Sequence, residues 1–175
     1  MDISEVQKSI IKKVENNTSG ENFPHITKNG KWVTTEDGYW TGGFWVGLLW
    51  LCYRITNNQK YKEWAYSWAS RLEKRRFNKT FDLGFLFYPS FVLGYKITGD
   101  DYFRRVSLDV AETLLTLFHK KSKFIYHVTK VDGKKVGRTI IDVMMNLPLL
   151  WWAFEETGNS VYYDCLLYTS PSPRD

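Results

Sequence analysis

A short polar turn occurs three times in the chain, and its spacing constrains the fold more than any other feature of the sequence. The turns begin at Thr56, Thr98 and Thr157, and each threonine is followed by Asn or Gly and then by Asn or Asp. Each turn follows a segment that is apolar on nearly every side, namely residues 44–53, 83–95 and 143–154. A helix that is apolar all round has to be enclosed by other helices. Gly or Asn at such a turn ends one helix in the left-handed conformation and lets the next begin.

The segments that follow the first two turns, residues 61–72 and 102–118, have an amphipathic helical period. The repeating unit is therefore an inner helix, a tight turn and an outer helix. Such pairs stack either into an open solenoid or into a closed α/α toroid with the apolar helices inside. The sequence thus predicts an all-α fold, with a small extended excursion near residues 124–138, around Asp132-Gly133.

Two carboxylates occupy equivalent places in this repeat. Thr41, Asp82 and Asp142 each open an inner helix, fifteen or sixteen residues before the threonine of the next turn. In a closed toroid the inner helices run parallel, so these N-termini gather at one mouth of the barrel. The sequence therefore predicts that Asp82 and Asp142 face a common cleft beside Trp40.

These residues have simpler interpretations as well. An Asp at the start of a helix is most often an N-cap that accepts hydrogen bonds from backbone amides. The apolar neighbours of Asp82 and Asp142 would instead remove water and favour the protonated form that a general acid needs, although a helix N-terminus favours the ionised form. Aromatic residues make up 17% of the chain, and Trp40 could pack in a core or stack on a sugar. His25, His119 and His127 are scattered, and are interpreted as surface or loop residues.

Several other classes of protein are disfavoured. The chain does not begin with a basic segment followed by an apolar one, so no secretory signal is visible. The most apolar stretch, residues 42–53, is too short to cross a bilayer. These features predict a cytoplasmic protein without a membrane partner. The net charge is only +5, and the basic clusters lie at expected helix ends, which favours a solvated surface over nucleic-acid binding. Cys52 and Cys165 offer neither a disulfide framework nor zinc-binding spacing, so no metal site is expected.

The last eleven residues break the pattern. Helical periodicity stops after Asp164, within an expected helix, and residues 165–175 end in a Pro- and Ser-containing string. That string resembles a translated transposase-type sequencing adapter; the alternative is a flexible natural terminus. We therefore expect residues 1–164 to be native and residues 165–175 to be a non-native tail.

Three segments resemble the unsaturated glucuronyl hydrolases, glycoside hydrolase family 88. They are Trp40-Thr-Gly-Gly-Phe-Trp-Val-Gly-Leu-Leu-Trp50, Asp82-Leu-Gly-Phe-Leu-Phe87 and Ile140-Ile-Asp-Val-Met-Met-Asn146. The similarity runs through most of residues 32–164, in the same order and spacing. It implies an (α/α)6 barrel of which residues 1–164 are the N-terminal part, with only the first five or six helices present. No metal or organic cofactor is implied.

The resemblance also implies roles for individual residues. Asp142 matches the general acid/base and Asp82 its catalytic partner, while Trp40, Phe81 and Asn146 are expected to bind substrate. Many family members have His at the position of Phe81, and many have a Trp a few residues before the Ile-Ile-Asp motif that this chain lacks. These departures concern substrate preference rather than the catalytic pair.

The implied reaction removes a 4,5-unsaturated uronic acid from disaccharides that polysaccharide lyases release. Acid/base catalysis would add water across the C4=C5 double bond. One alternative is an unsaturated rhamnogalacturonyl hydrolase on the same fold. Another is a non-catalytic helical-repeat binding module, which would leave Asp82 and Asp142 without a role. In either enzyme, the chain by itself is expected to be inactive.

Overall fold

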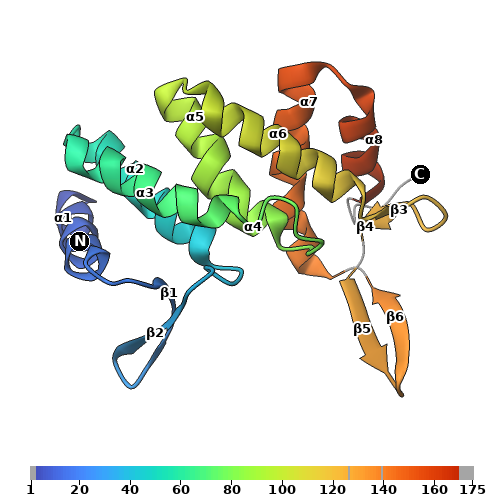
Figure 1. Cartoon of the computed structure of the whole chain (residues 1–175), viewed down its shortest axis with the longest axis horizontal. Coiled ribbons are helices and arrows are strands. Elements are labelled where there is room, and N and C mark those ends of the chain that lie inside the picture. The colour runs from blue at the N-terminus through green and yellow to red at the C-terminus, as the bar shows by residue number, and fades with distance from the viewer. Residues whose placement is uncertain (1–2, 126, 139, 170–175) are drawn as a thin grey trace.

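The computed structural model describes residues 3–125, 127–138 and 140–169, and most of them are helical (Figure 1). Three consecutive helix pairs form the body of the molecule, after an N-terminal helix α1 (Ile3–Thr18). The first pair is α2 (Gly42–Thr56) with α3 (Gln59–Glu73), and the last is α7 (Leu147–Thr157) with α8 (Ser160–Thr169). The middle pair joins a composite inner helix to α6 (Asp101–Leu115). The predicted inner and outer helices are thus confirmed, except that the start of the third inner segment is a 3-10 helix (Ile141–Asn146) rather than an α-helix.

The composite inner helix runs without a break from α4 (Leu83–Phe87) through a π-helical turn, η1 (Tyr88–Val92), into α5 (Leu93–Thr98). Pro89 lies at the start of η1 and has no amide hydrogen to donate, which favours the wider turn. The indole Nε1 of the buried Trp50 donates to the Ser90 carbonyl over 2.8 Å, so the altered backbone remains bonded. The sequence analysis predicted one helix here but not its π turn.

The three repeated turns have the same hydrogen bonds. In the second, the Thr98 hydroxyl donates to the Gly94 carbonyl at 2.7 Å and accepts from the Asp100 amide at 3.1 Å. Gly99 is left-handed with a φ of 68°, and the Asp100 carboxylate accepts from the Tyr102 amide at 2.9 Å. The same pattern recurs at 56–58 and 157–159. The predicted turn is therefore confirmed in all three copies.

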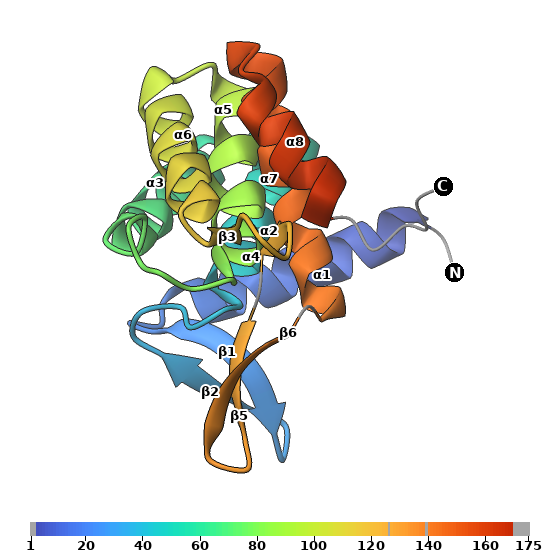
Figure 2. The same cartoon turned by 90° about the vertical axis from the view of Figure 1, so that its right-hand side faces the viewer.

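The described strands form three short antiparallel hairpins. The predicted extended pair is β5 (His127–Val131) with β6 (Lys134–Arg138), joined by left-handed Asp132 and Gly133. The other two are β1 (Phe23–Lys28) with β2 (Lys31–Thr35), and β3 (Phe118–His119) with β4 (Phe124–Ile125). The sequence analysis predicted neither of these, nor α1, and it extended α6 to Phe118. Figures 1 and 2 show β1–β2 and β5–β6 projecting from the same end of the helix array.

Helix α8 continues past the expected break after Asp164. Cys165 is buried, and the Thr169 hydroxyl accepts a hydrogen bond from the Ile125 amide of β4 at 3.3 Å. The expectation that helical structure stops at Asp164 is therefore wrong, because residues 165–169 are compatible with a helix and pack on the core. The origin of residues 165–175 remains a prediction, and residues 170–175 lie outside the described part of the chain.

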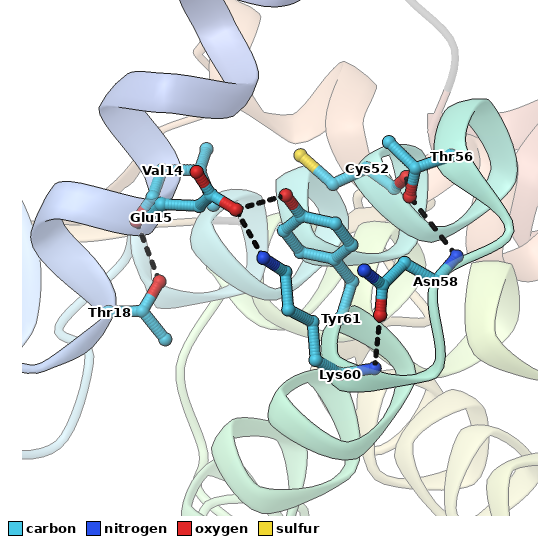
Figure 3. A network of polar contacts seen from close by, with 8 residues as sticks. All are labelled: Val14, Glu15, Thr18, Cys52, Thr56, Asn58, Lys60 and Tyr61. Atoms are coloured by element: carbon cyan, nitrogen blue, oxygen red, sulfur yellow. Dashed lines mark hydrogen bonds and ion pairs between the residues drawn. The ribbon is translucent and has the colours of Figure 1, made fainter.

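A polar network attaches α1 to the first helix pair (Figure 3). The Glu15 carboxylate accepts hydrogen bonds from the Lys60 ammonium and, at 2.7 Å, from the hydroxyl of the buried Tyr61. The hydrogen bond from Lys60, followed by that from Tyr61, lowers the pKa of Glu15 below its ordinary value. Burial, followed by the bond to Glu15, raises the pKa of Tyr61. The network supplements the single buried side chain of α1, Val14.

Replacing Tyr61 by Phe in the full-length protein is expected to speed hydrogen exchange of the α1 amides about fivefold, since an internal hydrogen bond contributes about 1 kcal/mol. Tyr53→Phe is the matched control, because the Tyr53 ring faces Lys62 outside this network. Because the pKa of Glu15 is lowered, ionised Glu15 stabilises the folded state fully at pH values above the ordinary pKa of glutamate. This stabilisation is lost as the pH falls through the lowered pKa. Equal exchange rates in both variants would contradict this role for Tyr61.

Candidate functional site

A cavity of about 710 Å³ lies where the inner helices begin, and it contains both predicted carboxylates. Its wall consists of Tyr39, Trp40, Lys79, Thr80, Phe81, Asp82, Phe85, Ile140 and Asp142. Asp82 and Asp142 are far apart in the sequence, and equivalent positions in the helix repeat bring them together. Of the five residues singled out from the sequence, four line this cavity, and Asn146 does not.

Asp82 immediately precedes α4 but does not cap it. Its side chain accepts no hydrogen bond from the first turn of α4. The Thr80 hydroxyl instead donates to Asp82 Oδ2 at 2.9 Å, and the Asp82 amide lies 3.3 Å from the same hydroxyl. The capping interpretation is therefore wrong for Asp82. Thr80 holds the half-buried carboxylate at the cavity wall.

Asp142 lies in the first turn of a 3-10 helix, η2 (Ile141–Asn146), which leads into α7. A 3-10 helix has three residues per turn, so Val143 and Asn146 share its buried side. Asp142 and Ile141 are exposed, and the Ile141 side chain retains 75% of its accessible surface. The expectation that apolar neighbours remove water from Asp142 is wrong in this structure, because Asp142 is exposed although Ile140 lines the same cavity.

Two glycines allow the inner helices to approach one another at the cavity. A Cβ atom on Gly43 of α2 would lie 2.2 Å from the Leu86 carbonyl oxygen of α4. A Cβ atom on Gly84 of α4 would lie 2.1 Å from the Met145 carbonyl oxygen of η2. Real side chains do not approach so closely, so the backbones can meet only at glycine. These contacts place the segments of Trp40, Asp82 and Asp142 around one space.

Asn146 connects the segments that contain Asp82 and Asp142. Its side chain is completely buried. The Oδ1 atom accepts from the Gly84 amide at 2.8 Å, and the Nδ2 atom donates to the Phe81 carbonyl at 2.8 Å. The expectation that Asn146 contacts substrate is not met by this position, because backbone groups occupy both ends of its amide. Asn146 instead fixes η2 against the residues that flank Asp82.

Asn146→Ala is expected to lower the free energy of unfolding by about 3 kcal/mol, because two buried backbone groups lose their partner. Asn159→Ala is the matched control, since it removes an exposed helix cap worth about 1 kcal/mol. Urea denaturation of both variants of the full-length protein measures the difference. Equal losses of stability would show that the buried amide contributes no more than an ordinary cap.

Four aromatic residues form an aromatic wall of the cavity, namely Tyr39, Trp40, Phe81 and Phe85. Trp40 is 36% exposed and meets Phe85 edge to face, with ring centroids 5.6 Å apart. Phe85 also meets Phe44, at 5.9 Å. Trp40 thus lies on the cavity surface rather than inside the core, and Phe81 lines the same space.

The sequence analysis missed several residues of this site. Tyr39, Lys79, Thr80 and Phe85 line the cavity. His25, interpreted as a surface or loop residue, does not line the cavity but contacts Trp40, with ring centroids 5.8 Å apart. The Asn29-Gly30 dipeptide, typical of a hairpin turn, was the signal that could have predicted β1–β2 and brought His25 back toward the helices. His119 bonds Ser122 in the β3–β4 turn, and the His127 side chain lies outside the described structure.

Within the described residues, no three His, Cys, Asp or Glu side chains converge as a metal site would require. None of the helices in that part of the chain has the length and apolar character needed to cross a membrane.

Comparisons with known proteins identify the family. The model of Glycosyl Hydrolase Family 88 matches residues 2–172. The unsaturated glucuronyl hydrolase of Bacillus sp. (strain GL1) is 36% identical over 149 residues, which are 82% of this chain and 40% of that protein. The unsaturated chondroitin disaccharide hydrolase of Streptococcus pneumoniae (strain ATCC BAA-255 / R6) is also 36% identical over 149 residues, 82% of this chain and 38% of that protein.

Solved structures of unsaturated glucuronyl hydrolases superpose on this chain. The crystal structure of the Bacillus sp. GL1 unsaturated glucuronyl hydrolase superposes with a TM-score of 0.82 at 33% identity, covering 91% of this chain and 44% of that one. The Streptococcus agalactiae enzyme superposes with a TM-score of 0.80 at 28% identity, covering 93% and 44%. These relatives are (α/α)6 barrels, so the helix pairs belong to a closed toroid rather than an open solenoid. The chain spans about 40% of the length of the curated relatives that it matches. With these matches along nearly its whole length, the chain belongs to glycoside hydrolase family 88.

Proposed function

We propose that residues 1–164 are the N-terminal part of the catalytic domain of an unsaturated glucuronyl hydrolase. The enzyme would release 4,5-unsaturated uronic acid from disaccharides that polysaccharide lyases produce, and would act in the cytoplasm without a cofactor. The observation that carries this proposal is that Asp82 and Asp142, from equivalent positions of the repeat, line the same cavity. The names of the relatives agree with an unsaturated uronic acid as substrate.

The proposed chemistry begins at the double bond of the substrate, which is a vinyl ether conjugated to a carboxylate. Asp142, as the acid, gives its proton to C4, and positive charge develops at C5 and the ring oxygen. A water molecule adds to C5 and loses a proton to the Asp142 carboxylate, which returns Asp142 to its acid form. The resulting hemiketal collapses, opens the ring and releases the neighbouring sugar. This differs from the usual attack of two carboxylates at the anomeric carbon.

The described residues suit these steps. Asp142 is exposed on η2, where substrate and water can reach it. Asp82 is oriented by Thr80, and as a carboxylate it stabilises the positive charge that forms during protonation. Trp40 and Phe85 offer apolar ring surfaces against which a flat unsaturated sugar can pack.

The test uses the full-length protein that contains this segment. It is incubated with unsaturated disaccharides from chondroitin, hyaluronan, heparin and pectin, and the loss of ultraviolet absorbance of the double bond is followed. Turnover of one or more glucuronyl substrates supports the proposal. Turnover of the pectin-derived substrate alone would favour the rhamnogalacturonyl alternative. Binding without turnover of any substrate would favour a binding module.

A further inference from the structure

The ring of His25 lies against two residues of the aromatic wall. It meets Tyr39 edge to face, with centroids 5.2 Å apart and planes at 90°, and Trp40 at 5.8 Å and 88°. Tyr39 and Trp40 line the cavity, whereas His25 is half-buried and does not. The orientation of the two wall residues therefore depends on a ring that a substrate in the cavity would not contact.

The ring of His25 is itself fixed. Its Nδ1 atom is 2.9 Å from the hydroxyl oxygen of Thr41, the residue that precedes α2. His25 belongs to β1, so this hydrogen bond attaches the β1–β2 hairpin to the start of an inner helix. Rotation of the imidazole would break the bond and remove its contacts with both aromatic rings.

Tyr39 has an unusual backbone that also needs support. Its φ of +42° lies in the left-handed region, which side chains other than glycine adopt only at a cost in free energy. The Tyr39 amide donates to Asp37 Oδ1 at 3.0 Å, and its carbonyl accepts from the Arg75 guanidinium. The backbone of Tyr39 is thus held from the Arg75 side, and its ring is held by His25.

From this arrangement we infer that His25 is a positioning residue, which presents the rings of Tyr39 and Trp40 to the sugar rings of the substrate. The inference rests on the proposed function for the identity of the ligand. Aromatic rings bind the apolar faces of sugars with little loss of conformational freedom if they are already oriented. A wall that contacts substrate and transition state equally affects KM rather than kcat.

The test compares three variants of the full-length protein. His25→Ala removes both ring contacts and the hydrogen bond, and is expected to raise KM about 5- to 30-fold while kcat changes less than about twofold. His25→Phe keeps an aromatic ring at this position and is expected to restore KM to within about threefold of the original. Thr41→Val removes only the hydrogen bond, which His25→Phe also lacks, and is expected to have a KM within about threefold of the original as well. A fall of kcat and melting temperature in His25→Ala with unchanged KM would overturn the inference, because packing alone explains that result.

A second measurement does not depend on turnover. Fluorine NMR of protein labelled with 5-fluorotryptophan reports on Trp40, whose resonance is assigned by its disappearance in Trp40→Phe. We expect His25→Ala to shift or broaden this resonance, and His119→Ala, which changes an exposed residue at the end of β3, to leave it unchanged. An unchanged Trp40 resonance in His25→Ala overturns the inference. If the unaltered protein turns over no unsaturated disaccharide, the proposed function fails and this spectrum alone decides the role of His25.

Discussion

Asp142→Asn in the full-length protein is expected to reduce kcat for unsaturated disaccharides by about 10²- to 10⁴-fold. The amide has nearly the same shape as the carboxyl group but can neither give a proton to C4 nor take one from water. Because Asp142 is exposed on η2, while Val143 and Asn146 hold that helix in the core, the fold should not change. Initial rates measured by the absorbance of the double bond, together with the circular dichroism spectrum, test both expectations.

The matched control is Asp132→Asn in the β5–β6 turn. This residue is also an exposed aspartate, and its left-handed backbone is readily adopted by Asn. The control should retain ordinary rates. Near-normal turnover in Asp142→Asn would transfer the acid/base role to another residue, and the remaining carboxylate of the cavity, Asp82, would be the next to replace.

A polypeptide of residues 1–175 alone is expected to give no measurable turnover and no sharp thermal transition. One face of α2 carries a stripe of large apolar side chains that remain 37–48% exposed, namely Phe44, Leu48, Leu51 and Ile55. On α7, Trp151 is 43% exposed. In a complete α/α barrel the inner helices are enclosed, so these faces are built for burial. Leaving about 300 Å² of such surface in water forfeits about 7 kcal/mol, which is comparable with the whole stability of a domain.

This prediction is checked by size-exclusion chromatography and by a thermal melt of the 175-residue chain beside the full-length protein. The shorter chain should elute as aggregates or as an expanded species, and its melt should be broad. A monomer that unfolds cooperatively and turns over substrate would show that these helix pairs need no further covering.

The helix pairs could be predicted because their information is local. Each turn depends on a threonine and on the left-handed residue that follows it, which is Asn57, Gly99 or Gly158. Both residues lie within a few positions of the apolar segment that forms the inner helix. The π turn was not predicted, although Pro89 marks its start, because its stability depends on a tertiary hydrogen bond from Trp50. Helix α1 was missed for a similar reason, since it has one buried side chain and depends on contacts with Lys60 and Tyr61.

In the candidate site, too, the features set by the local sequence could be predicted and those set by tertiary contacts could not. Asp82 and Asp142 could be paired from the repeat, because equivalent positions in parallel helices lie at the same end of the array. The burial of Asn146 and the exposure of Asp142 could not be predicted, because both depend on the 3-10 geometry of η2. His25 was missed because its hydrogen bond to Thr41 forms only when the hairpin folds back.

The close backbone contacts at Gly43 and Gly84 determine which residues of the cavity wall can change. Main-chain atoms and the buried Asn146 amide set the separation between the segments that contain Asp82 and Asp142. Most side chains of the cavity wall do not determine this separation. Phe81 lines the cavity, and only its backbone carbonyl bonds Asn146, so a change of its side chain can alter the shape of the cavity without moving either carboxylate. Side chains of the cavity wall can therefore be exchanged while the two aspartates keep their separation.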